Sequence, residues 1–268
     1  MNSLSISLVT YHPDIPMLRD TLASLRVAVA HARDARLLGE VHLRLVDNGN
    51  DPGLDQLALA AGWEDFSVIS GHGNVGFGEG HNRAFAAGVA DLQLVLNPDV
   101  YLQPDALFEA LRFMAEYSEC VLLSPAILGA ESGWHFLCKR YPSLLDLALR
   151  GFFPRVGRRF FAERLAQYEM QDCEGVPVLW DPPIVSGCFM LFRGAVLQRL
   201  KGFDPRYFLY FEDFDLSLRA AAEGRLAAVR AVRIAHFGGG AGRKGWRHVR
   251  MFSASAWTFF RTHGWKLF

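Results

Sequence analysis

The first apolar run of the chain reads Leu4-Ser5-Ile6-Ser7-Leu8-Val9-Thr10-Tyr11, and an amphipathic stretch from Ile15 to about Val29 follows it. The run is typical of a strand, and the stretch after it is typical of a helix. The same order recurs at Val41–Asp47 before Leu54–Ala61, at Phe66–Ile69 before Gly80–Ala90, and at Leu92–Leu96 before Pro104–Tyr117, and Val121–Leu123 starts another strand. This alternation predicts an α/β fold with a mostly parallel central sheet flanked by helices.

The composition is that of a globular protein with a sizeable core, since 51% of the 268 residues are hydrophobic and 21% are charged. The 28 Lys and Arg residues equal the 28 Asp and Glu residues, so the overall charge gives no support for nucleic-acid binding. The four cysteines are widely spaced, and no secretory leader or apolar run of about 20 residues is seen. We therefore expect one large cytoplasmic domain without a membrane span.

Polar residues follow the first two expected strands, as Thr10-Tyr11-His12 and Asp47-Asn48-Gly49-Asn50. Ligands of parallel α/β sheets collect at the carboxyl ends of the strands, so these loops are candidate walls of a nucleotide pocket. Asp47 is a candidate acceptor for a base or ribose hydrogen bond. The alternative is an Asx turn in which Gly49 supplies conformational freedom.

A glycine-rich segment runs from Gly71 to Arg83. Its glycines permit close approach to a ligand, and Arg83, expected at the start of the next helix, is placed to meet a phosphate. The segment lacks the Lys-Ser or Lys-Thr ending of a P-loop, and no GxGxxG follows an early strand, so neither an ATPase nor a dinucleotide oxidoreductase is favoured. A purely structural turn is the alternative.

Two acidic segments come later in the chain. Asn97-Pro98-Asp99 follows the strand Leu92–Leu96 and makes Asp99 the leading candidate ligand for Mg2+ or Mn2+, although such a segment can equally be a plain turn. The segment from Phe208 to Arg219 crowds three carboxylates among aromatic residues at an apparent helix start. Burial can make one of them a general base, whereas an acidic helix cap is the structural alternative.

These motifs occur in an order that resembles the family 2 glycosyltransferases, in particular their bacterial rhamnosyltransferase-like branch. The matching segments are Val9-Thr10-Tyr11, Val46-Asp47-Asn48, Gly73 to Gly78, Asn82-Arg83, Leu96 to Asp99, and Phe211 to Leu216. The resemblance implies a GT-A fold and inverting transfer of a sugar from a nucleoside diphosphate to an acceptor hydroxyl. It also implies a donor-binding half at residues 1–100, an acceptor and catalytic half at 101–245, and a C-terminal aromatic and basic segment at 246–268.

The resemblance assigns a role to individual residues. Asp213 is the expected general base. Glu212 either positions the acceptor or is an alternative base. Asp215 is either another alternative base or the ion-pair partner of Arg219 at helical spacing. His236 joins Asp99 as a metal ligand, and Asn97 takes the place of the first carboxylate of the usual Asp-x-Asp motif. The expected donor-binding residues are Thr10, Tyr11, Asp47, Asn74, Gly76, Phe77, Asn82, Arg83, Asn97, Ser186, Gly187 and Arg243.

Several segments in the second half of the chain allow more than one interpretation. Val185 to Arg193 reads as one buried strand, and the basic segment around Arg243 either closes over the donor diphosphate or is a solvated face. Residues 134–180 do not follow the alternation of strands and helices. Within them, residues 152–161 mix aromatic residues with arginines. This mixture is typical of an acceptor flap, of a surface that contacts anionic lipid, or of an ordinary insertion packed on the core. Trp246 to Phe268 is expected to form an amphipathic helix.

The expected partners are a nucleotide-sugar donor, for which the resemblance suggests dTDP-L-rhamnose, and a glycan or lipid-linked glycan acceptor of bacterial surface polysaccharide or lipopolysaccharide synthesis. Peripheral contact with the inner membrane from the cytoplasmic side is expected if the acceptor is lipid-linked. A UDP-hexose donor and an inactive nucleotide-sugar-binding scaffold are the alternatives.

Overall fold

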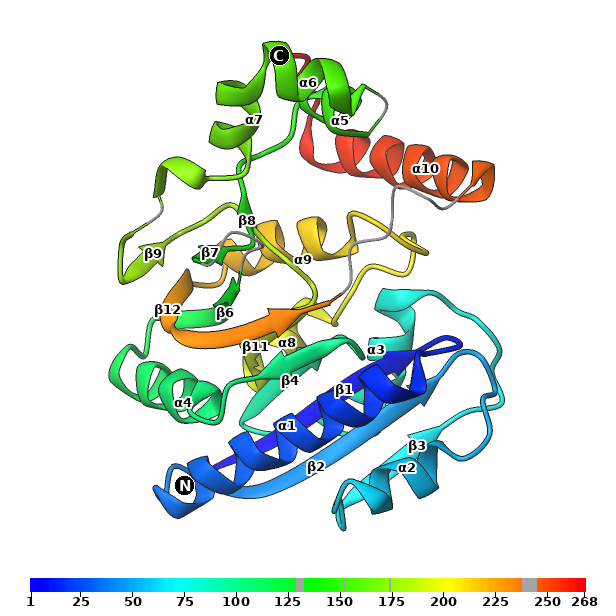
Figure 1. Cartoon of the computed structure of the whole chain (residues 1–268), viewed down its shortest axis with the longest axis vertical. Coiled ribbons are helices and arrows are strands. Elements are labelled where there is room, and N and C mark those ends of the chain that lie inside the picture. The colour runs from blue at the N-terminus through cyan, green and yellow to red at the C-terminus, as the bar shows by residue number, and fades with distance from the viewer. Residues whose placement is uncertain (129–132, 152, 174, 238–244) are drawn as a thin grey trace.

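The computed structural model describes residues 1–128, 133–151, 153–173, 175–237 and 245–268 (Figure 1). Its first half is the expected parallel block, in which neighbouring strands lie in the order β3, β2, β1, β4. The bounds of these strands are Asn2–Thr10 for β1, Leu38–Asp47 for β2, Phe66–Ile69 for β3 and Leu92–Leu96 for β4. Because they are parallel, their carboxyl ends share one edge of the sheet.

Helices connect these strands and cover the sheet: α1 (Ile15–Asp34), α2 (Leu54–Ala60), α3 (Phe77–Ala86) and, after a short strand, α4 (Ala106–Glu116). Helix α1 begins where the Asp14 carboxylate accepts a hydrogen bond from the Met17 N–H at 3.0 Å. Leu18, Leu22 and Leu25 form its inner stripe and are fully buried. Each such leucine contributes roughly 1.5–3 kcal/mol by leaving water, which fixes α1 on the sheet.

The second half of the sheet is mixed rather than mostly parallel. Strand β11 is antiparallel to both β4 and β6, whereas β12 is parallel to β6 and antiparallel to β5 and β9. The bounds are Val100–Leu102 for β5, Cys120–Leu128 for β6, Trp134–Phe136 for β7, Val178–Trp180 for β9, Phe189–Arg193 for β11 and Arg225–His236 for β12. Strand β7 is antiparallel to β6.

The expected single strand from Val185 to Arg193 is wrong. It is two strands, β10 (Ile184–Val185) and β11, separated by a break at Ser186, Gly187 and Cys188. Residues within β11 alternate between the two cores of the molecule, Leu191 facing the α1 and α4 side and Phe192 the opposite side. A strand buried on both faces is apolar throughout, so its sequence does not mark where it begins.

Helices α8 (Gly194–Leu200) and α9 (Glu212–Ala221) follow β11. The remaining elements gather at one end of the molecule (Figure 1). We call α5 (Leu144–Gly151), α6 (Pro154–Phe160), α7 (Ala162–Tyr168) and α10 (Trp246–His263) the helical cap. Its C-terminal tail is tied to α5, because the Leu144 N–H donates to the Lys266 carbonyl at 2.9 Å. A 3-10 turn, Gln171–Cys173, leads from α7 back to the sheet.

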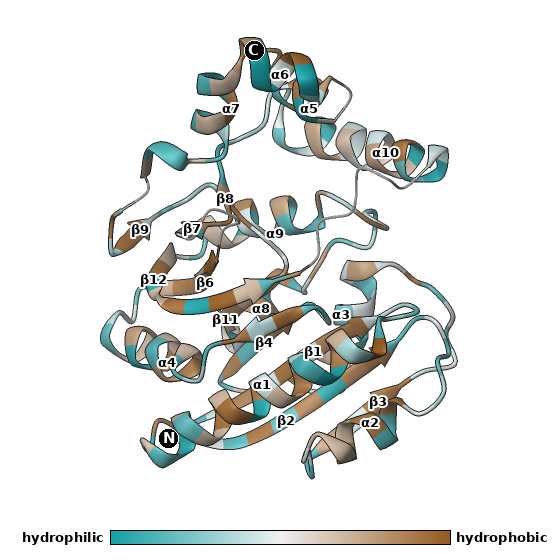
Figure 2. Cartoon of the chain, in the orientation of Figure 1, coloured by the Kyte–Doolittle hydropathy of each residue, from teal (hydrophilic) through white to brown (hydrophobic). Residues whose placement is uncertain are grey.

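The cap is joined to the rest of the fold by β8 (Cys138–Lys139), which pairs with β10, and by an aromatic core. Phe211 and Phe214 at the start of α9 pack on Phe259 of α10. The expected C-terminal helix is α10, which ends at His263 rather than continuing to Phe268. It buries Phe259 and Phe260 and exposes Trp246 and Trp257, and hydrophobic and hydrophilic residues alternate along it in Figure 2.

No helix among the described residues is both long and apolar enough to cross a membrane.

Candidate functional site

The predicted strand-end residues lie together. Thr10 is opposite Asp47 in the pairing of β1 with β2, and Leu8 is opposite Leu96 in the pairing of β1 with β4. Thr10 and Asp47 are buried, whereas Tyr11 is 56% exposed. The edge therefore presents one open aromatic ring beside buried polar groups, which is an arrangement suited to a nucleobase and its ribose.

Asp47 also makes the turn that the sequence left as an alternative, because its Oδ1 accepts a hydrogen bond from the Gly49 N–H at 2.9 Å. Next to it, the Asn48 amide donates to the Gly76 carbonyl at 2.9 Å and accepts from His72 at 2.9 Å. Asn48 thus fixes the glycine-rich loop to the end of β2.

The glycine-rich loop packs closely on the chain itself. Gly76 has φ +90°, and a Cβ at this position would lie 2.1 Å from the Phe208 carbonyl oxygen. That carbonyl accepts a hydrogen bond from the Phe77 N–H at 3.1 Å, and the Asn74 side chain accepts one from the Gly76 N–H at 3.0 Å. The loop thereby places Phe77 at the first position of α3, beside the segment that leads into α9.

The structure changes the interpretation of Asn82 and Arg83. Helix α3 begins at Phe77 rather than at Gly80, because Gly76 supplies the positive φ that turns the chain, so Arg83 lies in the second turn and pairs with Glu79 at 3.7 Å. The Asn82 amide both accepts from the Phe203 N–H and donates to the Phe203 carbonyl, each at 2.8 Å. Asn82 therefore holds the turn before α9.

The metal candidates meet at the end of β4 and the end of β12. The Oδ1 atom of Asp99 lies 3.2 Å from His236 Nε2, and the Asn97 amide nitrogen lies 3.4 Å from the same histidine atom. Asn97 Oδ1 and Asp99 Oδ1 are buried without a hydrogen-bond partner among the described residues. Such atoms are costly unless a ligand satisfies them.

Asp99 and Asn97 offer the carboxylate and amide oxygens that a divalent cation of the Mg2+ or Mn2+ type prefers as ligands. Within the described ranges no three His, Cys, Asp or Glu side chains gather into a metal site. The candidate set instead combines one carboxylate, one imidazole and the amide oxygen of Asn97. A ligand with its own oxygens, such as a diphosphate, would complete it.

The acidic pair lies at the start of α9. Tyr210 and Phe211 both adopt left-handed backbone conformations, with φ +72° and +67°, and this turn brings Asp213 against the break between β10 and β11. Asp213 Oδ2 accepts from the Gly187 N–H and its Oδ1 from the Phe214 N–H, both at 3.0 Å. Non-glycine residues in such conformations are strained, and they cluster at functional sites.

The two carboxyl groups differ in environment. Burial, and then the charge of Asp213, raises the pKa of Glu212 well above its ordinary value, and Glu212 Oε2 has no hydrogen-bond partner among the described residues. Burial also raises the pKa of Asp213, but the Lys139 charge and the N–H groups of Gly187 and Phe214 oppose it. Lys139 and the two N–H groups stabilise an ionised Asp213, whereas burial and the Asp213 charge oppose ionisation of Glu212, so Asp213 is the better candidate for a base.

Asp215 is not available as a base. Arg219 Nε donates to its Oδ2 at 2.8 Å, and His263 of α10 contacts its Oδ1 at 2.8 Å. The predicted pairing of Asp215 with Arg219 is confirmed, and this arginine also binds the carbonyls of Leu200 and Gly202. The role of Asp215 is to fasten α9 to the turn before it and to the helical cap.

Sequence reasoning missed Lys139. Its Nζ lies over the Phe214 ring, 5.1 Å from the centroid. Burial, followed by the charge of Arg150, lowers the pKa of Lys139, whereas Asp213 raises it. This lysine comes from β8, a two-residue strand in the region that fits no periodic pattern, so no sequence signal pointed to it.

Arg243 and the neighbouring Lys244, expected over the donor diphosphate, lie outside the described residues. Ser186 and Gly187 occupy the break between β10 and β11. A Cβ at Gly187 would lie 3.2 Å from Asp213 Cβ and 3.3 Å from the Phe77 ring. The break thus brings the base candidate, the glycine-rich loop and β11 into contact.

Comparisons with known proteins show the family to which the chain belongs. The model of the family described as "Glycosyltransferase like family 2" matches residues 8–265. The N-acetylglucosaminyl-diphospho-decaprenol L-rhamnosyltransferase of Mycobacterium tuberculosis is 29% identical over 283 residues, covering 98% of this chain and 86% of that protein. The rhamnosyltransferase WbbL of Escherichia coli is 26% identical over 208 residues, covering 73% of each protein.

A solved structure shares the fold. The mannosyltransferase PcManGT from Pyrobaculum calidifontis, in complex with GDP-Man and Mn2+, superposes with a TM-score of 0.58 at 15% identity, covering 98% of this chain and 76% of that one. At this identity the likeness concerns the fold alone. Together with the family match, it shows that the chain is a glycosyltransferase with a GT-A fold and belongs to the glycosyltransferase like family 2.

Proposed function

We propose that the protein transfers L-rhamnose from dTDP-L-rhamnose, with inversion, to a hydroxyl of a lipid-linked glycan in bacterial surface polysaccharide or lipopolysaccharide synthesis. The two relatives from Mycobacterium tuberculosis and Escherichia coli are rhamnosyltransferases, and the former acts on a diphospho-decaprenol acceptor, as its name says. The observation that carries the proposal is the position of Asp213, a carboxylate held by Gly187 beside the glycine-rich loop.

Asp213 is the proposed general base. The acceptor hydroxyl oxygen attacks the anomeric carbon on the face opposite the departing diphosphate, the C–O bond to the diphosphate breaks, and the hydroxyl proton passes to Asp213. The products are the inverted glycoside, protonated Asp213 and dTDP. Lys139, Gly187 and Phe214 favour the ionised form of Asp213 and so oppose the burial that raises its pKa.

The donor occupies the edge formed by β1, β2 and the glycine-rich loop. Tyr11, being exposed, covers the base, while Thr10 and Asp47 face the ribose. Phe77 and Gly187 form the wall near the transferred sugar. Asn74 and Asn82 act mainly by shaping this wall, since their amides bind the backbone of Gly76 and Phe203.

Asp99, His236 and Asn97 are the residues that would hold Mg2+ or Mn2+. A divalent cation there would supply positive charge against the diphosphate.

The proposed location is the cytoplasmic face of the inner membrane, where a lipid-linked acceptor would lie. The helical cap exposes apolar side chains, among them Phe153 and Phe160, next to Arg159, which stacks on Phe160. Exposed aromatics with arginines suit an anionic bilayer surface. Sedimentation with vesicles rich in phosphatidylglycerol should remove the protein from the supernatant at low salt; protein remaining in solution would count against this location.

The donor is tested by calorimetric titration of dTDP-L-rhamnose, UDP-glucose, UDP-galactose and GDP-mannose, with and without Mg2+ or Mn2+. We expect the tightest binding for dTDP-L-rhamnose, strengthened by the metal. Preference for a UDP-hexose would keep the reaction and change the product. Binding of none of the four would favour an inactive scaffold.

A further inference from the structure

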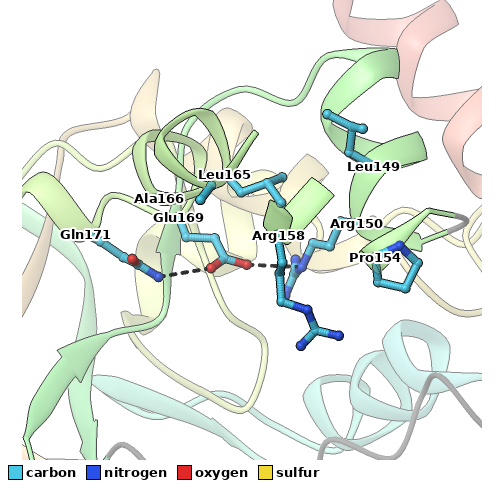
Figure 3. A pocket seen from close by; sticks show the side chains of 9 residues that line it. Leu149, Arg150, Pro154, Arg158, Leu165, Ala166, Glu169 and Gln171 are labelled. Atoms are coloured by element: carbon cyan, nitrogen blue, oxygen red, sulfur yellow. Dashed lines mark hydrogen bonds and ion pairs between the residues drawn. The ribbon is translucent and has the colours of Figure 1, made fainter. Parts of the chain in front are cut away.

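A cavity of about 440 Å³ lies in the helical cap, between α5, α6 and α7 (Figure 3). Its polar side chains are Arg150, Arg158, Glu169 and Gln171, and Leu149 and Leu165 contribute apolar walls. The site described above uses none of these residues. A cavity that combines arginines with aliphatic walls suits an anionic group attached to an apolar chain.

The two arginines of the cavity differ in their pairing. Arg150 Nε lies 3.1 Å from Glu169 Oε1, and Gln171 donates to the other oxygen of Glu169 at 3.2 Å. Arg158 makes no ion pair or hydrogen bond with the described residues, and Figure 3 shows its guanidinium extending away from Glu169. The cavity therefore carries one positive charge that the protein leaves uncompensated.

Backbone contacts connect the cavity to the base. Tyr168, on the α7 wall, accepts a hydrogen bond at its carbonyl from the Arg140 N–H at 2.9 Å, next to Lys139 on β8. Strand β8 pairs with β10, which leads directly to Gly187 and Asp213. Lys139 precedes Arg140 in the chain and pairs with Ile184 of β10, so β8 joins helix α7 to the strand that leads to the base.

We infer that this cavity binds the diphosphate of the lipid-linked acceptor, with Arg158 as its principal contact, Arg150 as a second one, and the aliphatic walls along the first units of the prenyl chain. The inference rests on the proposed function, which supplies the class of acceptor. The acceptor sugar then extends past Lys139 and presents its hydroxyl to Asp213. Arginine is the residue that binds diphosphate oxygens most specifically, because its planar group offers paired donors.

The test is calorimetric binding of a short prenyl diphosphate ester of N-acetylglucosamine, in detergent and without donor. We expect Arg158→Gln to weaken binding about tenfold or more, as the loss of a charge-assisted hydrogen bond does. Glu169→Gln should strengthen binding, because it releases Arg150. Arg155→Gln, an exposed change on the same helix outside the cavity, is the matched control and should leave binding unchanged.

General damage to the helical cap cannot weaken acceptor binding in Arg158→Gln and strengthen it in Glu169→Gln. Equal binding by the wild type and Arg158→Gln, or no binding by the wild type, would overturn the inference. Titration with dTDP separates this site from the donor site, since Arg158→Gln should bind dTDP normally, and a parallel loss would also overturn it. Transfer to a phosphate-free alkyl N-acetylglucosaminide reports on the proposed reaction independently, so failure of the reaction and failure of this inference are distinguishable.

Discussion

Gly187 donates its backbone N–H to the Asp213 carboxylate at 3.0 Å, and a Cβ on Gly187 would lie 3.2 Å from the Cβ of Asp213. The hydrogen bond and the missing side chain together set the position of the base. We expect Gly187→Ala to push Asp213 or Phe77 aside and to lower kcat by about 10- to 100-fold, because misplacing a reacting group by about 1 Å costs that much.

Steady-state kinetics and donor titration check the Gly187→Ala prediction. The dissociation constant of the donor should change much less than kcat, since the buried groups at the ends of β1 and β2 are untouched. An unaltered kcat would show that Asp213 does not need this contact.

Lys139 should control the pH at which the base works. Its positive charge opposes the rise in the pKa of Asp213, so Lys139→Met should raise that pKa further. The base acts in its ionised form, and the acidic limb of the kcat/KM profile should therefore move to higher pH. Lys139→Arg keeps the charge and should largely restore the wild-type profile. An unshifted limb in Lys139→Met would contradict this role.

Substitutions of Asp99 and Asn97, the candidate metal ligands, should change the metal requirement in opposite directions. Asp99→Asn should raise the Mg2+ or Mn2+ concentration needed for half-maximal transfer by at least about 10-fold, since even outer partners of metal ligands contribute about 10- to 100-fold to affinity. Asn97→Asp should lower it, because a second carboxylate joins the set. Metal titrations of activity in both variants provide the test, and a metal response unchanged in both would remove this set as the binding site.

His81 makes folding stability depend on pH. It is fully buried, its Nδ1 lies 2.7 Å from Ser7 Oγ, and burial lowers its pKa from 6.5 to about 3. Between these values the unfolded chain binds a proton that the folded chain does not, so the free energy of unfolding falls as the pH drops, by up to about 1.4 kcal/mol per pH unit. Above 6.5 this term is constant.

Urea unfolding at several pH values between 7 and 4 measures that slope. His81→Gln should remove the contribution of His81 to the pH dependence of the unfolding free energy. His31→Gln, an exposed change on α1, should leave that pH dependence as in the wild type. A His81→Gln slope equal to that of the wild type would mean that other groups cause the acid sensitivity.

The sequence revealed the parts of this protein that depend on local pattern. The strands β1, β2 and β4 and the polar residues at their ends could be predicted because each strand carries regularly placed apolar residues and is followed by a polar loop. The spacing of Asp215 and Arg219 likewise predicted their pair. Contacts between distant segments could not be predicted: the Asn82 amide binds Phe203, 121 residues away, and the Gly76 turn fits against Phe208.

Two features lacked any sequence signal. The break between β10 and β11 lies inside an apolar run that both halves of the core require, so nothing in the composition marks Gly187 as the contact of Asp213. Lys139 stands among residues without helical or strand periodicity, and only the pairing of β8 with β10 brings it near the base. Tertiary pairing, rather than residue type, decides both positions.

The most direct test of the account compares Asp213→Asn and Glu212→Gln for rhamnosyl transfer from dTDP-L-rhamnose and for donor binding by calorimetry. We predict that Asp213→Asn lowers the transfer rate by about 100- to 10,000-fold, the usual contribution of a general base, while the donor dissociation constant stays within about threefold. Glu212→Gln, which replaces a carboxyl group whose pKa is raised by burial and by the Asp213 charge, should lose less. Transfer by Asp213→Asn at the wild-type rate, or a larger loss in Glu212→Gln, would contradict the assignment of Asp213 as the base.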